Sequence, residues 1–426
     1  MDLSTNSVRK EGFDKVILIL YLLIVTFGIM NIYSSEHSIT EPFNLTMSMR
    51  TVKQLIWLGI SLFVGIAIVF VVSAKLFETY SPVIYLFTEF LLIAVIFLGV
   101  EIKGSHSWFA LGPVRFQPAE LAKIATSLYL AAIMSYPTFS LHKWKDFITA
   151  AIIVLLPMAT ILLENETGSS LVFASLVFVF YREGLSGWLL VALGAFILFF
   201  ILSLILPLWV AVVILASLLL VLLAFTIKKV TKRRRLRFMT TLGAIFLAGT
   251  AYIYSVNYIF NNILLDHQRK RIAVLLGIME DPLGIGYNVT QSMIAIGSGG
   301  FIGKGYLNGT QNILGFVPEQ STDFIFCTVG EEWGFIGCLF LLGLYIALIL
   351  RIILVSERAK TAFCRIYGYC LACIIFFHVI VNIGMTIGLM PVIGIPLPFF
   401  SYGGSSLLGF TTMLMIFLAI LRSEKR

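Results

Sequence analysis

Hydrophobic residues recur along this chain in runs of about 20, and short polar stretches separate one run from the next. A helix of that length crosses a lipid bilayer. The pattern predicts an all-α polytopic membrane protein, a bundle of about 12 transmembrane segments that forms a single domain over residues 1–426. The predicted segments are residues 14–34, 53–73, 80–100, 118–136, 146–163, 169–182, 188–206, 208–227, 238–258, 323–350, 363–389 and 405–421. Only Pro207 divides the seventh from the eighth, so one kinked element and a total of eleven is the alternative.

Composition and charge support this class and give it an orientation. Hydrophobic residues make up 59% of the chain and charged residues 12%, against about 25% charged in a soluble domain. With a cytoplasmic N-terminus, 21 of the 30 lysines and arginines lie on the cytoplasmic side and 8 on the outer side. This bias predicts that both termini are cytoplasmic. The net charge of +8, concentrated in Lys228–Arg237, is therefore a topology signal beside anionic lipid, and we expect no nucleic-acid partner.

With this topology, residues 259–322 form a large extracytoplasmic loop between segments 9 and 10. Within it, Ala295–Gly305 has some P-loop character. However, Ser298 stands where that motif needs glycine, and Gly305 stands where it needs serine or threonine. We expect no nucleotide site there. The five cysteines all lie in predicted helices and are expected to be small packing residues.

Ionisable residues inside predicted segments are costly in lipid, so each is a candidate for function. Glu120 and Lys123 lie at i, i+3 on one helix face, which allows an ion pair. Such a pair is either structural or part of substrate handling, and the sequence leaves both open. Glu331 and Glu332 fall inside the tenth segment, so at least one must face the bundle interior or a wet cavity.

Three other ionisable residues have simpler explanations. Glu164 and Glu166 lie where two segments meet on the outer side, as expected for a solvated turn. His378 stands alone in the middle of a predicted helix, which favours a hydrogen-bonded structural histidine.

Three features of the loop 259–322 point to chemistry. The cluster Arg269–Arg271 lies just outside the membrane, where it suits a phosphate or pyrophosphate or, alternatively, lipid headgroups. Asp281 precedes Pro282, a pair that also fits an ordinary helix start. The stretch GFVPEQSTDF places polar residues at the outer mouth of the tenth segment: Glu319, Gln320, Thr322 and Asp323.

With these stretches, the chain closely resembles the SEDS family of bacterial shape, elongation, division and sporulation proteins, and most closely its elongation branch. The segments that carry the resemblance occur in the family order: Trp108–Ile124, Gln268–Ile272, Asp281–Gln311, Pro318–Phe326, Gly330–Gly337 and Gly384–Ser406.

Two departures accompany the resemblance. The family pattern P-D-L-G-T-A is replaced by Asn165–Ser170, in which Glu166 keeps a carboxylate but the proline is lost. The family also has ten membrane helices, so residues 188–245 are expected to hold an extra helical hairpin and a basic cytoplasmic loop.

The resemblance implies a peptidoglycan glycosyltransferase of the bacterial inner membrane, active in cell elongation and rod-shape maintenance. Its substrate would be lipid II, the undecaprenyl-pyrophosphate disaccharide pentapeptide, which it would polymerise into β-1,4 glycan strands. An α-linked donor and a β product require inversion, for which one general base suffices, and the family motif assigns that role to Asp281.

Other site residues also follow from the resemblance. Arg269 and Arg271 would stabilise the departing pyrophosphate, with Arg115 and Lys304 as weaker candidates. A divalent cation, magnesium or manganese, is a further candidate for that task, but no metal ligand is assigned. The remaining residues expected at the substrate site are the family ion pair Glu120 and Lys123, together with Glu319, Thr322, Asp323 and Ser405.

The expected partners are lipid II, a class B penicillin-binding transpeptidase, the elongation machinery and the lipid bilayer. One alternative is a flippase for lipid-linked precursors, since Glu331 and Glu332 within the membrane would suit proton coupling. A flippase needs sites reachable from both faces, whereas this chain concentrates its polar detail on one. A structural scaffold without chemistry is the third alternative.

Overall fold

Two compact units make up the chain. A computed structural model describes residues 14–36, 49–102, 105–112, 114–228, 231–264, 266–276, 278–279 and 286–424. Unit 1 comprises Met1–Leu185 with Asn288–Arg426, and unit 2 comprises Ser186–Tyr287.

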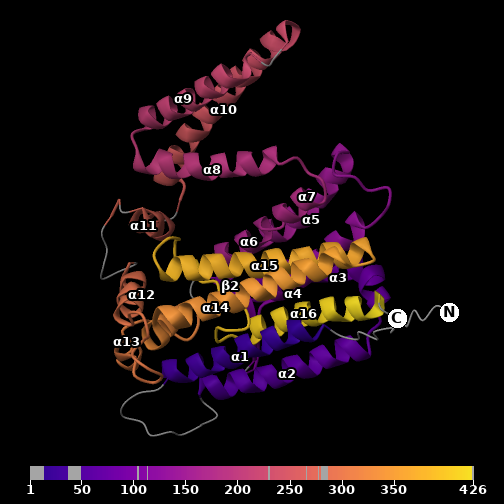
Figure 1. Cartoon of the computed structure of the whole chain (residues 1–426), viewed down its shortest axis with the longest axis vertical. Helices are drawn as coiled ribbons and strands as arrows, with labels where there is room; N and C mark the ends of the chain where they lie inside the picture. Colours follow the sequence, from indigo (N-terminus) through magenta and orange to yellow (C-terminus); the bar gives the residue numbers. More distant parts are fainter. Residues whose placement is uncertain are drawn as a thin grey trace, which may run out of the picture. The chain divides into compact units, whose positions relative to one another are not determined.

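Unit 1 consists mainly of long apolar helices that lie side by side, with α14 against α1 and α15 and with α16 against α2 (Figure 1). Its elements are α1 (Lys15–Glu36), α2 (Arg50–Phe70), α3 (Ala74–Leu98), β1 (Val100–Ile102), β2 (Ser105–Leu111), β3 (Val114–Phe116), α4 (Pro118–Met134), α5 (Trp144–Leu163), α6 (Thr167–Ala174), α7 (Val177–Arg182), α12 (Tyr287–Ser298), α13 (Thr310–Ile313), α14 (Ile325–Glu357), α15 (Ala362–Thr386) and α16 (Gly404–Glu424).

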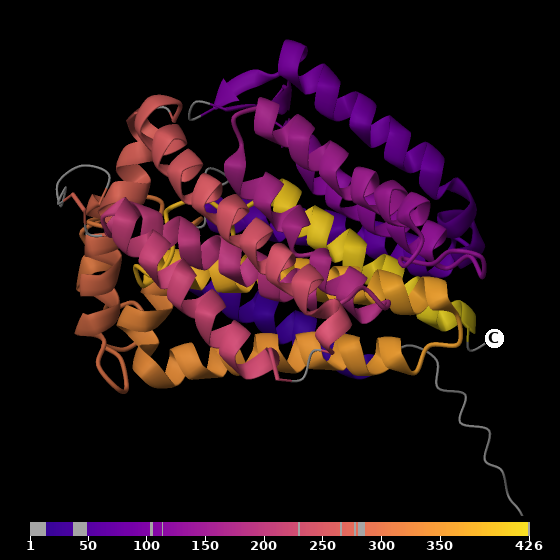
Figure 2. The same cartoon turned by 90° about the horizontal axis from the view of Figure 1, so that it is seen from above.

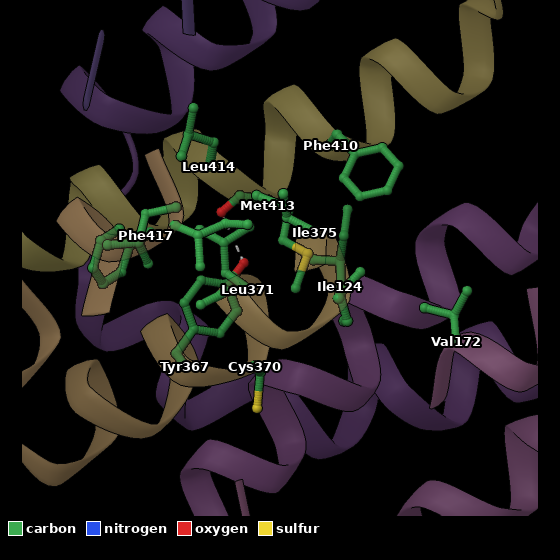
Figure 3. Close-up of a cluster of buried hydrophobic side chains, with 14 of the residues drawn as sticks. Ile124, Val172, Tyr367, Cys370, Leu371, Ile375, Phe410, Met413, Leu414 and Phe417 are labelled. Atoms are coloured by element: carbon green, nitrogen blue, oxygen red, sulfur yellow. Dashed lines mark hydrogen bonds between the residues drawn. The ribbon is translucent and has the colours of Figure 1, made fainter. Parts of the chain in front are cut away.

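The core of unit 1 lies where α4, α15 and α16 meet. Most residues of these three helices are buried, as expected for helices that are apolar on all sides. In lipid, close side-chain packing and interhelical hydrogen bonds hold such helices together. The Tyr367 hydroxyl donates one such bond to the Met413 carbonyl at 3.0 Å. Figure 3 shows the packed side chains, among them Ile124, Leu371, Ile375, Phe410 and Leu414.

A small antiparallel sheet connects α3 to α4. Strand β2 pairs with both neighbours, with Trp108 opposite Val100 and Ala110 opposite Arg115. Gly112 between β2 and β3 has φ 64°, a left-handed conformation that glycine adopts without strain. The sequence analysis predicted only a loop here, so the sheet is an addition. It places Arg115 on a regular strand.

Unit 2 is formed by α8 (Trp188–Ile205), α9 (Leu208–Thr226), α10 (Lys232–Asn262) and α11 (Asp266–Leu275). Helices α8 and α9 both pack against α10, and α9 and α10 lie side by side in Figure 1 and Figure 2. The buried cluster of this unit is small and consists of Phe199, Ala211, Leu215 and Ile253. Most other apolar side chains of α8 and α9 are exposed, as suits helices surrounded by lipid.

The fold class predicted from the sequence is confirmed. Within the described ranges, ten helices are long and apolar enough to cross a membrane. Every predicted segment coincides with helix, but α4 has only 17 residues, and the sixth segment is divided into α6 and α7. Residues 188–227 form two helices rather than one kinked element. The count of twelve therefore remains a prediction, as do the domain boundaries and the extra hairpin.

Candidate functional site

Glu120 and Lys123 form a buried ion pair on α4, with 2.8 Å between Oε1 and Nζ. Pro118 occupies the first turn of α4, where proline fits the helix start and where the carboxylate of Glu120 complements the helix dipole. Both side chains are almost inaccessible to solvent. Because burying charge costs several kcal/mol per ion, such a pair needs further partners.

The ammonium of Lys123 has two of these partners on other helices. It lies 3.3 Å from Nε2 of His378 on α15 and 4.5 Å from the ring centroid of Phe410 on α16. An ammonium can only donate, so Nε2 accepts, and Nδ1 carries the proton. Nδ1 then donates to the Pro396 carbonyl at 3.1 Å. The network starting at Glu120 thus joins α4, α15 and the loop that precedes α16.

That loop is also hydrogen-bonded to the stretch before α14. The backbone N–H of Tyr402 donates to the Ser321 carbonyl at 2.9 Å, and the Ser401 hydroxyl donates to the Thr322 carbonyl at 2.7 Å. The carbonyl of Asp323 accepts a 2.9 Å bond from a side chain of α15. The polar residues predicted before α14 therefore lie against the FFSYGG loop.

Glu319 lies at the strained end of this stretch. Its φ of 57° is left-handed, which is uncommon for a residue with a side chain. Its carboxylate accepts a 2.9 Å hydrogen bond from the Thr322 hydroxyl. Two of the predicted substrate-binding side chains thus contact each other.

Ser405 and Arg115 are brought together from opposite ends of the sequence. The Ser405 hydroxyl at the start of α16 donates to the Arg115 carbonyl on β3 at 3.0 Å. The guanidinium of Arg115 remains exposed. Nearby, Arg50 at the start of α2 donates to the Ser321 hydroxyl, and its guanidinium carbon lies 5.8 Å from the ring centroid of Tyr402.

Glu331 is fully buried and accepts four hydrogen bonds from the outer segment before α14. The donors are the ammonium of Lys304 at 2.7 Å, the hydroxyl of Thr310 at 3.2 Å, and the backbone N–H groups of Gln311 at 2.8 Å and Asn312 at 3.2 Å. The last two belong to the first turn of α13, whose N–H groups lack partners within the helix. The carboxylate therefore caps α13 and pairs with Lys304, which was predicted as a weak pyrophosphate ligand.

The same outer segment is inserted into a break in α14 at Gly334, where φ is 63° and ψ is −159°. Beyond the break, the N–H of Phe335 donates to the Gly300 carbonyl at 3.0 Å; before it, the Glu332 carbonyl accepts from the N–H of Gly305 at 3.0 Å. A Cβ on Gly303 would lie 2.2 Å from the Glu332 carbonyl oxygen. The close approach of the two backbones requires glycine at 303 and 334.

Glu332 accepts a hydrogen bond from Ser34 on α1. The sequence predicts that at least one of these two glutamates faces the bundle interior or a wet cavity; both are buried, and each accepts a hydrogen bond from a neighbouring element.

The prediction of a solvated turn at Glu164 and Glu166 is wrong for Glu164, which is only 1% exposed. Burial, with the charges of Glu166 and Glu89, raises the pKa of Glu164 from 4.5 to about 8. Oε1 of Glu166 accepts hydrogen bonds from Gln117 and from the Ser169 hydroxyl, the latter at 2.8 Å. The turn is also bonded to β2, since the N–H of His106 donates to the Glu164 carbonyl at 3.3 Å.

The predicted catalytic loop lies partly outside the described residues. Asp281 is not among them, so its role as general base stays a prediction. Arg269 lies on α11 in unit 2, where its guanidinium donates to Asp266 at 2.8 Å. Arg271 belongs to the same helix, but its side chain is not described. The other predicted site residues all lie in unit 1.

The sequence analysis did not single out Arg50, Ser321 or Tyr402. Arg50 is one of the eight basic residues that the predicted topology places on the outer side, against the positive-inside bias. A basic residue on the disfavoured side of the membrane was the one sequence feature that could have drawn attention to Arg50. Its neighbours Ser321 and Tyr402 could not be known, because they come from distant parts of the chain.

The chain matches known proteins over nearly its whole length. The profile of the FtsW/RodA/SpoVE family, described as cell cycle protein, matches residues 14–217 and 210–426. The chain is 34% identical to peptidoglycan glycosyltransferase MrdB of Escherichia coli K12, over 95% of this chain and 94% of that protein. It is 33% identical to peptidoglycan glycosyltransferase RodA of Treponema pallidum, over 93% and 94%.

Two solved structures resemble the fold. One, described as a peptidoglycan synthase complex that coordinates polymerization and crosslinking, superposes with a TM-score of 0.69 at 29% identity, covering 97% of this chain and 98% of the other. The rod shape determining protein RodA of Thermus thermophilus superposes with a TM-score of 0.62 at 24% identity, with the same coverage, and that likeness supports the fold alone. On the profile match and the identities together, this chain belongs to the FtsW/RodA/SpoVE family of membrane proteins.

Proposed function

We propose that this membrane protein is a peptidoglycan glycosyltransferase that polymerises lipid II into β-1,4 glycan strands during cell elongation. The observation that carries the proposal is its 34% identity, over 95% of the chain, to a relative named peptidoglycan glycosyltransferase. The placement of the predicted polar residues supports it: Arg115, Glu319, Thr322, Asp323 and Ser405 lie in or beside loops of unit 1 that are hydrogen-bonded to one another.

The proposed reaction is a single displacement with inversion. The 4-hydroxyl oxygen of the acceptor sugar forms a bond to the anomeric carbon of the donor, and the bond from that carbon to the pyrophosphate oxygen breaks. The hydroxyl proton passes to the carboxylate of Asp281. Arg269 and Arg271 stabilise the negative charge of the departing pyrophosphate.

The buried residues of α4 position the site rather than react. The pair Glu120–Lys123 is inaccessible to a sugar, but through His378 it supports the carbonyl of Pro396. Removing one member strands a buried charge and would disturb the loop that bears Tyr402.

A divalent cation stays a proposal. In the part of the chain that the structure describes, no group of three or more histidine, cysteine, aspartate or glutamate residues could hold one. Chelation of the assay mixture tests whether a metal ion is needed.

We also propose a class B penicillin-binding transpeptidase and the elongation machinery as partners, and the bacterial inner membrane with both termini cytoplasmic as the location. The similarity to a chain of a peptidoglycan synthase complex supports the first. A flippase is less well supported, because Glu331, one of the two carboxylates that suggested proton coupling, is engaged by Lys304 and by the start of α13.

In the decisive experiment, the purified chain and its transpeptidase partner are incubated with labelled lipid II in detergent, without a sealed membrane, and glycan polymer is measured. We expect glycan polymer. Asp281→Asn should lower the rate by about 10² to 10⁴, the usual effect of removing a general base, while insertion and thermal stability stay normal. The matched control is Glu101→Gln, which removes an exposed carboxylate from the outer strand β1. Full activity of a well-folded Asp281→Asn variant would exclude Asp281 from the mechanism, and no polymer from wild type would favour the flippase.

A further inference from the structure

On the predicted outer side of unit 1, two exposed arginines carry positive charge without a carboxylate partner within the described residues. Neither Arg50 nor Arg115 forms an ion pair there, whereas Arg182, Arg351 and Arg365 each pair with an acidic side chain. Both lie on the outer side in the predicted topology, where basic residues are disfavoured. Unpaired arginine at such a position is suited to an anionic ligand.

Glu36 lies beside Arg50 but forms no ion pair with its guanidinium. Its carboxylate accepts hydrogen bonds from the backbone N–H groups of Arg50 at 2.8 Å and Thr51 at 2.9 Å, and from the Thr51 hydroxyl at 2.9 Å. These bonds satisfy the first turn of α2. The guanidinium of Arg50 is left to Ser321 and the ring face of Tyr402.

The frame around these arginines is tightly fixed. The side chain of Gln54, one turn beyond Arg50, donates to the Ser401 carbonyl at 3.2 Å and accepts from the Gly403 N–H at 3.2 Å. The start of α16 is tied to the strand of Arg115 by the Ser405 hydroxyl. Arg50, Arg115 and Tyr402 are therefore held by elements that are bonded to one another.

Tyr402 links the two arginines electrostatically. Partial burial raises the pKa of its hydroxyl. The positive charges of Arg50 and Arg115 act to lower that pKa, and the negative charge of Glu36 acts to raise it. One phenol group thus experiences both guanidinium charges. An anion beside the hydroxyl would be stabilised by the same two charges and could accept the phenolic proton as a hydrogen bond.

We propose that Arg50, Arg115 and the Tyr402 hydroxyl form a binding site for the pyrophosphate of a polyprenyl-linked substrate. This inference rests on the proposed function, in which two lipid-linked chains meet and each carries a pyrophosphate at the outer membrane surface. Arg269 and Arg271 were assigned to the departing group of the donor. Arg50 and Arg115 would supply the positive charge that the pyrophosphate of the acceptor substrate requires.

The test measures binding without turnover. The full-length chain in detergent is titrated with undecaprenyl pyrophosphate and, separately, with neutral undecaprenol. Arg50→Gln and Arg115→Gln should each weaken binding of the pyrophosphate lipid about 10- to 100-fold, the effect of removing charge-assisted hydrogen bonds. Binding of undecaprenol should not change. Lys53→Gln is the matched control, because it removes an exposed charge from the same helix one turn away.

Two further binding measurements show whether the site recognises pyrophosphate or any anionic lipid headgroup. Inorganic pyrophosphate should compete with the lipid in wild type and compete less well in the variants. Phosphatidylglycerol vesicles should bind wild type and variants equally. An equal loss for phosphatidylglycerol would make the site a general headgroup anchor and overturn the proposal, and so would unchanged affinity for undecaprenyl pyrophosphate.

Two conservative variants guard against misfolding. Arg50→Lys keeps the charge but loses the planar fork, and Tyr402→Phe keeps the ring but loses the hydroxyl, so each should give a smaller loss. Failure of polymerisation by the wild-type chain would refute the proposed function while leaving these binding data intact. Normal polymerisation with unchanged binding in all four variants would refute only this site.

Discussion

At the residue scale, Glu331 shows how a side chain that looks out of place in a membrane helix is satisfied. The sequence indicated that its carboxylate must face the protein or water, but it could not name the partners. Lys304 and Thr310 come from a segment more than twenty residues earlier, and one of the contacts is a helix start that the sequence did not predict. The burial was predictable because lipid is intolerant of charge, whereas the geometry was not.

The pair Lys304–Glu331 gives a prediction about stability. Glu331→Ala should lower the free energy of unfolding by about 3 kcal/mol, because it strands Lys304 and uncaps α13. Lys304→Ala should cost less, since Lys304 is 26% exposed and the carboxylate keeps its other three donors. The double variant should be less stable than Glu331→Ala by little or nothing. Urea unfolding in detergent, with limited proteolysis of residues 299–313, provides the measurement, and strictly additive losses would contradict a shared interaction.

Glu164 gives a prediction about pH. Its pKa is raised from 4.5 to about 8, so between these values the folded state holds a proton that the unfolded state releases. The free energy of unfolding should therefore fall as the pH rises from about 4.5 to 8. Glu164→Gln, which imitates the neutral carboxyl, should reduce that slope, whereas the exposed control Glu78→Gln should leave it unchanged. Thermal midpoints across this pH range measure the effect, and an identical slope in wild type and Glu164→Gln would contradict it.

At the element scale, α4 is joined to α15 by a contact between Lys123 and His378 within a largely apolar interface. Glu120, Lys123 and His378 form a buried chain of hydrogen bonds that ends at a loop carbonyl. Polar contacts of this kind fix the relative register of helices that apolar packing alone would specify less strictly. The register matters here because the loop after α15 bears the residues proposed to bind substrate.

If Glu120 and Lys123 act as one ion pair, the losses caused by replacing each should not add up in the double variant. Glu120→Ala and Lys123→Ala should each reduce both stability and polymerisation strongly, since either one leaves a buried charge unpaired. The double variant should be no worse than the worse single variant. Parallel unfolding and polymerisation assays test this, and additive losses would show that the two residues act separately.

Helix positions were largely predictable from the sequence, and tertiary partners were not. Runs of apolar residues located every long helix, and the i, i+3 spacing of Glu120 and Lys123 predicted their ion pair. The strands around Arg115 were missed because they are short and because no apolar run marks them. The pairing of Arg50 with Ser321 and Tyr402 joins residues hundreds of positions apart, which one sequence cannot specify.

At the scale of the whole molecule, α8 and α9 differ from the rest of the chain. They contain no ionisable residue between Trp188 and Ile227, and only a few of their side chains are buried. No catalytic group can come from them. Their contribution is therefore expected to be to stability or to contacts with lipid, not to the reaction.

Topology provides the test at this scale. A reporter fused after Arg237 should give a cytoplasmic signal, because seven basic residues between Lys228 and Arg237 disfavour the outer side by about 1 kcal/mol each near an anionic surface. A second fusion after Thr361, in the loop between α14 and α15, should report the same side. An external signal after Arg237 would contradict the predicted orientation and the outer placement of Asp281.

The break in α14 also restricts how this protein can diverge in evolution. A side chain on Gly303 would meet the Glu332 carbonyl at 2.2 Å, and one on Gly334 would meet the Gly303 nitrogen at 2.4 Å. Neither glycine can be exchanged without moving the backbone that opposes it. Phe301 and Ile302 point outward beside them and meet no such limit. Neutral substitutions in this segment should therefore accumulate at Phe301 and Ile302, whereas Gly303 and Gly334 should be retained together.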